Sequence, residues 1–366
     1  MDPDELEDLR LILPPLLHAV EALGFVSRYL HPPDLAAVVD ACGQPDLALI
    51  ALLPRLEGWA PGLTDLSAAL RTASESTIQA FVELRAAIDQ ADDIGPVFRA
   101  LRHRPRALEA LYPLAEHLPP VSRLFLDPLH RDDADLMARL ATPGPDTGVH
   151  HVDNDAAARG GYSVYVPEDY SPDSRAPLVM ALHGGSGHGR SFLWSWLRDA
   201  RTYGAILVAP TSVGRTWAIS GADPDTPNLA RILQDVRRRW NVDPERLLLA
   251  GMSDGGTFAA VSGLEPGSPF THLAFTSSAF HPMLAQMADP VRITGLPVYL
   301  THGALDWMFP VTMARAAHQG LERAGARVSY REVDDLSHTY PSELNADVLA
   351  WMRSVDRMAP APGHPI

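Results

Sequence analysis

Short apolar segments alternate with amphipathic helical stretches after residue 160, and this alternation strongly limits the folds open to the chain. The apolar segments are YSVYVP (162–167), PLVMALHG (177–184), AILVAP (205–210), RLLLAG (246–251), HLAFTS (272–277), PVYLTHG (297–303) and VSYREV (328–333). Helical stretches such as 228–240 and 311–325 lie between several of them. Because strands buried on both faces are continuously apolar, the pattern predicts an α/β fold: a mostly parallel sheet with helices on both faces.

The first 141 residues show a helical pattern instead, clearest in residues 63–90. Prolines interrupt this region repeatedly, and each should begin or end a helix. They are Pro32, Pro33, Pro54, Pro96, Pro105, Pro119 and Pro120. We therefore predict an all-α N-terminal domain over 1–141, made of several short helices.

Residues 142–160, TPGPDTGVHHVDNDAAARG, are rich in proline, glycine and polar residues and are predicted to form a linker. The second domain is then expected over 161–357, followed by a flexible tail over 358–366.

The segment LLLAGMSDGGTFAA (247–260) places Ser253 between Gly251 and the pair Gly255–Gly256. The pattern G-x-S-x-G after a buried strand and before a helix is typical of a sharp turn that exposes a serine hydroxyl. The predicted strand ends just before this serine, and ligands bind at the carboxyl ends of strands in such sheets. Ser253 is therefore our candidate nucleophile.

A serine nucleophile needs a base, and the base needs an orienting acid. His338 follows the last predicted strand and is the candidate base; Asp306 follows the strand 297–303 and is the candidate acid. Asp306 could instead cap the next helix, in which case Asp334 or Asp335 would supply the acid. His338 could likewise be an ordinary surface histidine.

An oxyanion hole needs backbone N–H groups aimed at developing negative charge. One donor is expected from Asp254, the residue after the serine, and the other from Gly185 in LHGGSGHG (182–189), with Gly184 and Ser186 as alternatives. A carboxylate beside this hole would oppose negative charge, so we expect the side chain of Asp254 to point away. His183 and His302 sit in HG turns, where hydrogen bonds to the backbone are the expected role.

Composition excludes several other chemistries. The net charge is −15, which argues against a nucleic-acid groove. All 30 basic residues are arginine, so there is no lysine for a Schiff base, a P-loop or a Ser–Lys dyad. Cys42 is the single cysteine, and the adjacent His150 and His151 lie in the predicted linker without partner ligands. We predict no metal and no cofactor.

The N-terminal segment MDPDELEDLRLILPPLLHAV is acidic, and Pro14 and Pro15 break its apolar run. We therefore expect no signal peptide, no membrane insertion and a cytoplasmic location.

From about residue 161 to 355 the chain resembles the α/β-hydrolase superfamily, especially its phospholipase/carboxylesterase and dienelactone-hydrolase-like branch. That branch is similar to feruloyl esterases and polyhydroxybutyrate depolymerases. The matching segments are LHGG, NVDPERLLLAGMSDGG, THGALDWMFP and LSHTYP, in the order Ser, Asp, His. The resemblance implies a catalytic triad of Ser253, Asp306 and His338, with Gly185 and Asp254 as oxyanion donors.

The chain departs from the family pattern in three ways. Trp307 stands where members often have a proline or small residue, and Asp254 where methionine or glutamine is common. The helical N-terminal region has no counterpart in that branch.

The segments near these motifs are rich in aromatic residues. They are Phe192, Trp194, Trp196, Trp217, Phe280, Trp307 and Phe309. Such residues mostly serve cores, but we expect some rings to line an acyl or aryl pocket. Gly184, Ser186, Trp194, Trp217 and Trp307 are the candidate substrate-binding residues.

The sequence thus predicts a serine carboxylesterase acting on small apolar esters, with a small-molecule ester as its partner. Two alternatives stay open: a peptidase or acyl-protein thioesterase on the same scaffold, and an interaction protein with a vestigial hydrolase domain. The N-terminal domain could cap the site, mediate homodimerisation or bind another partner.

Overall fold

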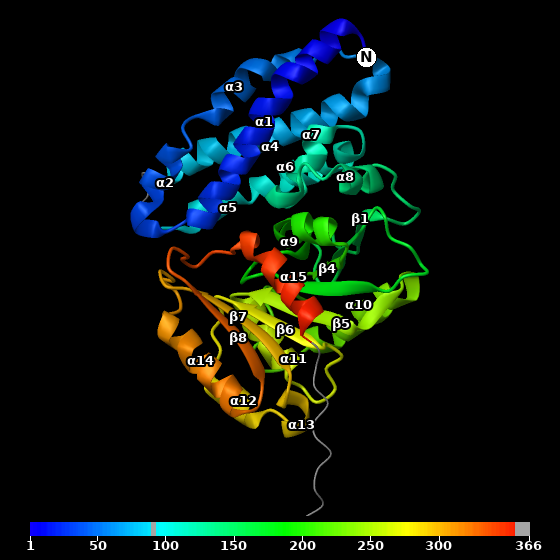
Figure 1. Cartoon of the computed structure of the whole chain (residues 1–366). Helices are drawn as coiled ribbons and strands as arrows, with labels where there is room; N and C mark the ends of the chain where they lie inside the picture. The colour runs from blue at the N-terminus through cyan, green and yellow to red at the C-terminus, as the bar shows by residue number, and fades with distance from the viewer. Residues whose placement is uncertain (89–92, 356–366) are drawn as a thin grey trace, which may run out of the picture. The chain divides into compact units, whose positions relative to one another are not determined.

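The computed structural model describes residues 1–88 and 93–355, and the chain forms two compact units, Met1–Ala141 and Thr142–Ile366 (Figure 1). The predicted tail over 358–366 lies outside the described residues.

Unit 1 is helical throughout its described part, as predicted. Its α-helices are α1 (Pro3–Tyr29), α2 (Leu35–Ala41), α3 (Pro45–Leu52), α4 (Thr64–Ile88), α5 (Gly95–Leu101), α6 (His103–Leu111), α7 (Pro119–Leu124) and α8 (Ala134–Leu140). Short 3₁₀ turns connect them: η1 (Pro32–Asp34), η2 (Leu53–Leu56), η3 (Pro61–Leu63), η4 (Tyr112–Glu116) and η5 (Pro128–His130). Most of the prolines named above stand at the start of one of these elements, where a missing N–H costs little.

Helix α1 continues through Pro14 and Pro15, although a proline inside a helix usually breaks it. The carbonyls that lose their N–H donors are those of Arg10 and Leu11, and both residues are exposed. Because water can hydrate these two carbonyls, the helix tolerates the proline pair. A capping box between Asp2 and Glu5 fixes its first turn.

By length and composition, α1 is apolar enough to cross a membrane, with a mean hydropathy of 1.5. The helical stretches Pro32–Ala41 and Pro45–Leu56 pass the same test together, with a bend of 51°. These findings rest on length and composition alone, and the expectation of no membrane insertion stays a prediction. The buried side of α1 packs against α3, α4 and α6, as in a core helix of a folded unit.

Unit 2 is built on one eight-stranded sheet. Its strands are β1 (Gly148–Val152), β2 (Tyr162–Val166), β3 (Ala176–Leu182), β4 (Ile206–Pro210), β5 (Val242–Met252), β6 (His272–Thr276), β7 (Pro297–Gly303) and β8 (Arg327–Val333). Their order in the sheet is β1-β2-β4-β3-β5-β6-β7-β8. Strands β3 to β8 run parallel to one another, and β1 and β2 form the antiparallel edge. All seven predicted strands are present.

Helices cover both faces of this sheet (Figure 1). They are α9 (Gly189–Tyr203), α10 (Asp225–Arg239), α11 (Asp254–Gly263), α12 (Pro282–Met287), α13 (Pro290–Ile293), α14 (Val311–Arg323) and α15 (Asn345–Ser354), with the 3₁₀ turn η6 (Ser342–Leu344) before the last. One face packs against α10, α11 and α14 in a single apolar core. The other face packs against α9 and α15. The α/β prediction is confirmed.

Strand β1 corrects the linker prediction. Residues 148–152 lie in the segment assigned to a linker, yet they pair with β2 from Gly148↔Val166 to Val152↔Tyr162. His150 and His151 are therefore half-buried strand residues and not part of a solvated loop. The Nδ1 of His151 lies 2.7 Å from the hydroxyl of Ser163 in β2.

Candidate active site

Ser253 occupies a strained turn between β5 and α11. Its backbone angles are φ 54° and ψ −122°, a region that residues with a side chain seldom adopt. The flanking glycines are required by close backbone approach: a Cβ at Gly251 would lie 2.2 Å from the carbonyl oxygen of Gly255. A Cβ at Gly255 would lie 2.4 Å from the carbonyl oxygen of His183. The G-x-S-x-G pattern thus reflects a turn that holds the serine at the end of a central strand.

His338 joins Ser253 and Asp306 in one hydrogen-bonded row. Its Nε2 lies 3.0 Å from Ser253 Oγ, and its Nδ1 lies 3.0 and 3.1 Å from the two carboxylate oxygens of Asp306. All three residues are buried, with exposed fractions of 7%, 4% and 8% in the order Ser253, His338, Asp306. The structure therefore brings together the three side chains that the sequence singled out.

The carboxylate of Asp306 is held in place by its own loop. One of its oxygens accepts hydrogen bonds from the backbone N–H groups of Met308 and Phe309, at 2.9 and 2.8 Å. Burial raises the pKa of this carboxyl, but the hydrogen bonds from His338 and Phe309 outweigh burial, and the net pKa is lowered. Asp306 therefore stays ionised beside the imidazole. Asp334 and Asp335, the alternative acids, are both exposed.

The loop after β3 lies directly beside the serine. A Cβ at Gly184 would lie 3.6 Å from Ser253 Cβ. The carbonyl of Gly184 accepts a hydrogen bond from Gly187 N at 3.0 Å and lies 2.7 Å from His183 Nδ1. Since C=O and N–H point in opposite directions across a trans peptide, these bonds also orient the N–H of Gly185. Within residues 1–88 and 93–355, the N–H groups of Gly185 and Asp254 have no hydrogen-bond partner.

The side chain of His183 supports this loop through two hydrogen bonds. Its Nε2 accepts a hydrogen bond from Ser212 N at 3.2 Å, so Nδ1 carries the proton that bonds to Gly184. Burial lowers the pKa of His183 to about 3, so the ring is neutral. His302 bonds through Nε2 to the carbonyl of Phe309 at 2.8 Å. The prediction that both HG-turn histidines bond to the backbone is confirmed.

The side chain of Asp254 is engaged by a residue that the sequence did not single out. The hydroxyl of Thr216 donates to Asp254 Oδ2 at 2.6 Å. The same oxygen lies 2.8 Å from the point where a Cβ at Gly185 would stand. The carboxylate therefore fills the space beside Gly185, and only glycine fits there without displacing it.

The predicted substrate-binding residues separate into two groups. Trp217 and Trp194 are only 2% and 6% exposed, so neither ring is open to a substrate. Trp217 donates from Nε1 to the carbonyl of His183 and stacks on Phe258, which makes it a support of the loop. Trp307 is partly exposed, and its ring centroid lies 5.9 Å from that of His338.

Ser186 is exposed beside the loop glycines with a φ of 55°, and its hydroxyl accepts a hydrogen bond from Arg215 Nε at 3.3 Å. The rings of Phe192 and Trp196 face Tyr340, and Phe280 stacks on Phe275 in the core. Phe309 is the second aromatic ring against His338, at 5.2 Å between centroids. Of the aromatic candidates, Trp307 and Phe309 thus border the reacting groups.

The sheet and the position of the serine define the class. A mostly parallel sheet with a serine on the turn after a central strand, followed by an acid after β7 and a histidine after β8, is the arrangement of the α/β-hydrolases. Unit 2 has the α/β-hydrolase fold.

Comparisons with known proteins find similar sequences. A family model described as Phospholipase/Carboxylesterase matches residues 218–355. Acyl-protein thioesterase 1 of Eremothecium gossypii is 25% identical over 218 residues, which cover 52% of this chain and 92% of that protein.

Two further relatives match shorter segments. A bifunctional acetylxylan esterase/xylanase of Neocallimastix patriciarum is 29% identical over 99 residues, or 26% of this chain. A poly(3-hydroxybutyrate) depolymerase of Ralstonia pickettii is 28% identical over 115 residues, or 25% of this chain. The matches span only 14% and 23% of these two relatives' own lengths.

Solved structures show the same kind of similarity. A thermostable esterase has a TM-score of 0.47 at 20% identity, covering 58% of this chain and 63% of that chain. A ferulic acid esterase has a TM-score of 0.47 at 15% identity, covering 57% of this chain and 96% of that chain.

Proposed function

We propose that the protein is a serine hydrolase that cleaves carboxylic esters through an acyl-enzyme. Ser253 is the nucleophile, His338 the general base and acid, and Asp306 the group that orients the imidazole. The observation that carries the proposal is the row Ser253 Oγ–His338 Nε2, 3.0 Å, continued from Nδ1 to the Asp306 carboxylate. These three side chains supply the nucleophile, the base and the acid that this chemistry requires.

The reaction follows from these positions. Ser253 Oγ attacks the ester carbonyl carbon while its proton passes to His338 Nε2, and the carbonyl oxygen becomes an oxyanion. The N–H groups of Gly185 and Asp254 would stabilise that oxyanion. His338 then gives the proton to the departing alkoxide. A water molecule, deprotonated by the same nitrogen, releases the acid and restores the serine.

Apolar side chains around the acid loop support a small apolar substrate. Trp307 and Phe309 lie against the imidazole, and Leu305 and Met308 of the same loop are 42% and 51% exposed. Apolar side chains close to the reacting atoms favour acyl or aryl groups over charged ones. Relatives named as an acetylxylan esterase and a poly(3-hydroxybutyrate) depolymerase also act on esters by their names.

Ser253→Ala tests the proposal. The variant should lose hydrolysis of a p-nitrophenyl ester, with kcat lower by a factor on the order of 10⁴ or more, and should no longer react with a fluorophosphonate probe. Ser174→Ala, which changes an exposed serine between β2 and β3, is the matched control and should behave as wild type. Retained turnover in Ser253→Ala would reject the assignment.

Thioester cleavage is the second candidate. The acyl-protein thioesterase relative matches over nearly its whole length, and the same three side chains serve either leaving group. A panel of matched oxygen esters, thioesters and aminoacyl amides, compared by kcat/KM, would rank the three. A thioester preferred over its matched oxygen ester would replace the carboxylesterase assignment.

A further inference from the structure

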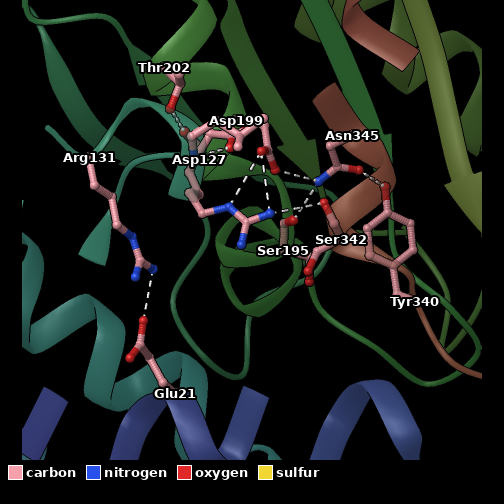
Figure 2. A network of polar contacts seen from close by, with 11 residues as sticks. Glu21, Asp127, Arg131, Ser195, Asp199, Thr202, Tyr340, Ser342 and Asn345 are labelled. Atoms are coloured by element: carbon pink, nitrogen blue, oxygen red, sulfur yellow. Dashed lines mark hydrogen bonds and ion pairs between the residues drawn. The ribbon is translucent and has the colours of Figure 1, made fainter. Parts of the chain in front are cut away.

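A buried polar cluster follows His338 in the chain and binds the next residues to helix α9. The hydroxyl of Tyr340 donates to Asn345 Oδ1 at 2.7 Å. Asn345 Nδ2 donates to the carbonyl of Ser195 at 2.8 Å and to Asp199 Oδ2 at 3.0 Å. Figure 2 shows Asn345 between Tyr340 on one side and Ser195 and Asp199 on the other.

The orientation of the Asn345 amide is fully specified by its partners. Burial raises the pKa of Tyr340 well above its usual value of 10, and the carboxylates of Asp199 and Glu343 raise it further. The phenol therefore keeps its proton and donates it, which assigns the accepting oxygen of the Asn345 amide. The amide nitrogen then faces two acceptors on α9. Asn345 is 1% exposed, so loss of the Tyr340 hydroxyl would leave the buried amide oxygen of Asn345 without that partner.

Helix α9 also starts at the loop beside Ser253. The helix begins at Gly189, directly after the segment His183–His188, and the side chain of His188 caps its first turn. A further bond to α9 joins the chain after the histidine, since Arg198 Nη2 donates to the carbonyl of Ser342 at 3.3 Å. One rigid helix therefore connects the Gly184–Gly185 loop with the segment that carries His338.

A small hollow lies under this segment at the ends of β5, β6 and β7, lined in part by Trp196, Thr276, Thr301, Tyr340, Pro341 and Asn345. The hydrogen bonds of Asn345 and Tyr340 hold the segment beside this hollow, in addition to the packing of the Tyr340 ring on Phe192 and Trp196.

We propose that Asn345 and Tyr340 are positioning residues that set His338 against Ser253 by fixing its segment to α9. This inference rests on the proposed function. The imidazole must take the proton of Ser253 Oγ across the 3.0 Å that separates them, and a shift of about 1 Å in a reacting group can cost on the order of 10²-fold in rate. Neither residue touches the substrate, so their effect falls on kcat and leaves KM in place.

Tyr340→Phe is the first test, because it removes the hydroxyl and keeps the ring against Phe192 and Trp196. The matched control is Tyr162→Phe. It removes a phenol hydroxyl that is bonded to Asp235 and lies on β2, next to the edge strand β1 of the sheet. Ester turnover, the rate of inactivation by a fluorophosphonate probe, and the urea midpoint are measured for each full-length variant.

We expect kcat and the probe rate of Tyr340→Phe to fall about tenfold with KM unchanged. This loss is smaller than the cost of a full 1 Å shift, which is on the order of 10²-fold in rate. We expect Tyr162→Phe to lower the urea midpoint about as much as Tyr340→Phe does, but to leave kcat unchanged. If kcat and the probe rate of Tyr340→Phe equal those of wild type, the residue is only structural and the inference is overturned.

Asn345→Ala and the double variant Tyr340→Phe/Asn345→Ala make a thermodynamic cycle on kcat. If the two residues act as one unit, the double variant should be no slower than the slower single variant. Fully additive losses would contradict the shared role. Should Asn345→Ala not fold, Tyr340→Phe alone still decides. A wild-type protein that fails to react with the probe would instead reject the proposed function itself.

Discussion

The two units differ in where their backbone is strained. Among the described residues, those other than glycine with positive φ are Asp146, Asp153, Ser186, Ser253 and Ser277, all in unit 2. Ser186, Ser253 and Ser277 come after the carboxyl ends of β3, β5 and β6. In the described part of unit 1, only Gly43 and Gly58 adopt positive φ. Strain costs stability and persists where the surroundings enforce it, so its concentration at one edge of unit 2 marks that edge as the functional one.

Buried polar groups follow the same division. In unit 1, Asp46 is fully buried and pairs with Arg85, a contact that ties α3 to α4. In unit 2, His183, Asp306 and His338 gather at the edge that carries Ser253. Unit 2 also has a buried pair of this structural kind, Arg201–Glu168, but only unit 2 gathers buried titratable groups around the proposed nucleophile, and this difference can be tested by substitution.

The largest effect is expected from Asp306→Asn. The amide would favour the wrong imidazole tautomer and would not stabilise the imidazolium, so kcat for ester hydrolysis should fall by about 10⁴-fold. The fold should persist, because the amide oxygen can still accept from Met308 and Phe309. Asp334→Asn and Asp335→Asn are the controls, and a comparable loss in either would return the acid's role to that residue.

The second effect concerns pH. Burial holds the pKa of His183 at about 3, compared with 6.5 for an exposed histidine. Between these values the unfolded chain binds a proton that the folded chain does not, so stability is complete above pH 6.5 and is lost as the pH falls. One such group contributes about 1.4 kcal/mol per pH unit to the slope.

Urea unfolding from pH 4 to pH 7 measures this slope. His183→Gln should flatten it, and Ser174→Ala, which changes an exposed serine that does not titrate, should keep the wild-type slope. Equal slopes for wild type and His183→Gln would show that the ring accepts a proton in the folded state.

The smallest effect is expected from Arg85→Met in unit 1. Loss of the guanidinium leaves the Asp46 carboxylate buried and unpaired, and the unfolding free energy should fall by about 2 kcal/mol, since Arg85 itself is partly exposed. Ester turnover should not change, and Asp46→Asn in the same chain should recover part of the stability. A large loss of kcat in a folded Arg85→Met protein would break the division between the units.

The sequence predicts the sheet well because strands buried on both faces must be continuously apolar. Strand β1 escaped prediction because it is a half-buried edge strand, GVHHV, whose histidines and flanking glycine resemble a loop. Phe192, Trp194 and Trp196 recur at every second residue, as on a strand, in a segment expected to be a loop or the start of a helix, and the structure places them on α9. Phe192 and Trp196 share one helical face, four residues apart, and both face Tyr340.

The proposed catalytic groups could be found in the sequence because each stands at a fixed place relative to a strand end. Their supports could not. Thr216 reaches Asp254 across 38 positions, and Asn345 reaches Asp199 across 146. No local pattern indicates such bonds, because they depend on how the loops after different strands come together in space.

The shared space of Gly185 and Asp254 makes the two positions dependent on each other in evolution. A side chain at 185 is blocked as long as the acid at 254 occupies that space, and shortening residue 254 would open it. Substitutions there are therefore ordered: a change at 254 has to precede any change at 185. Descendants of this chain that keep an aspartate at 254 should keep glycine at 185.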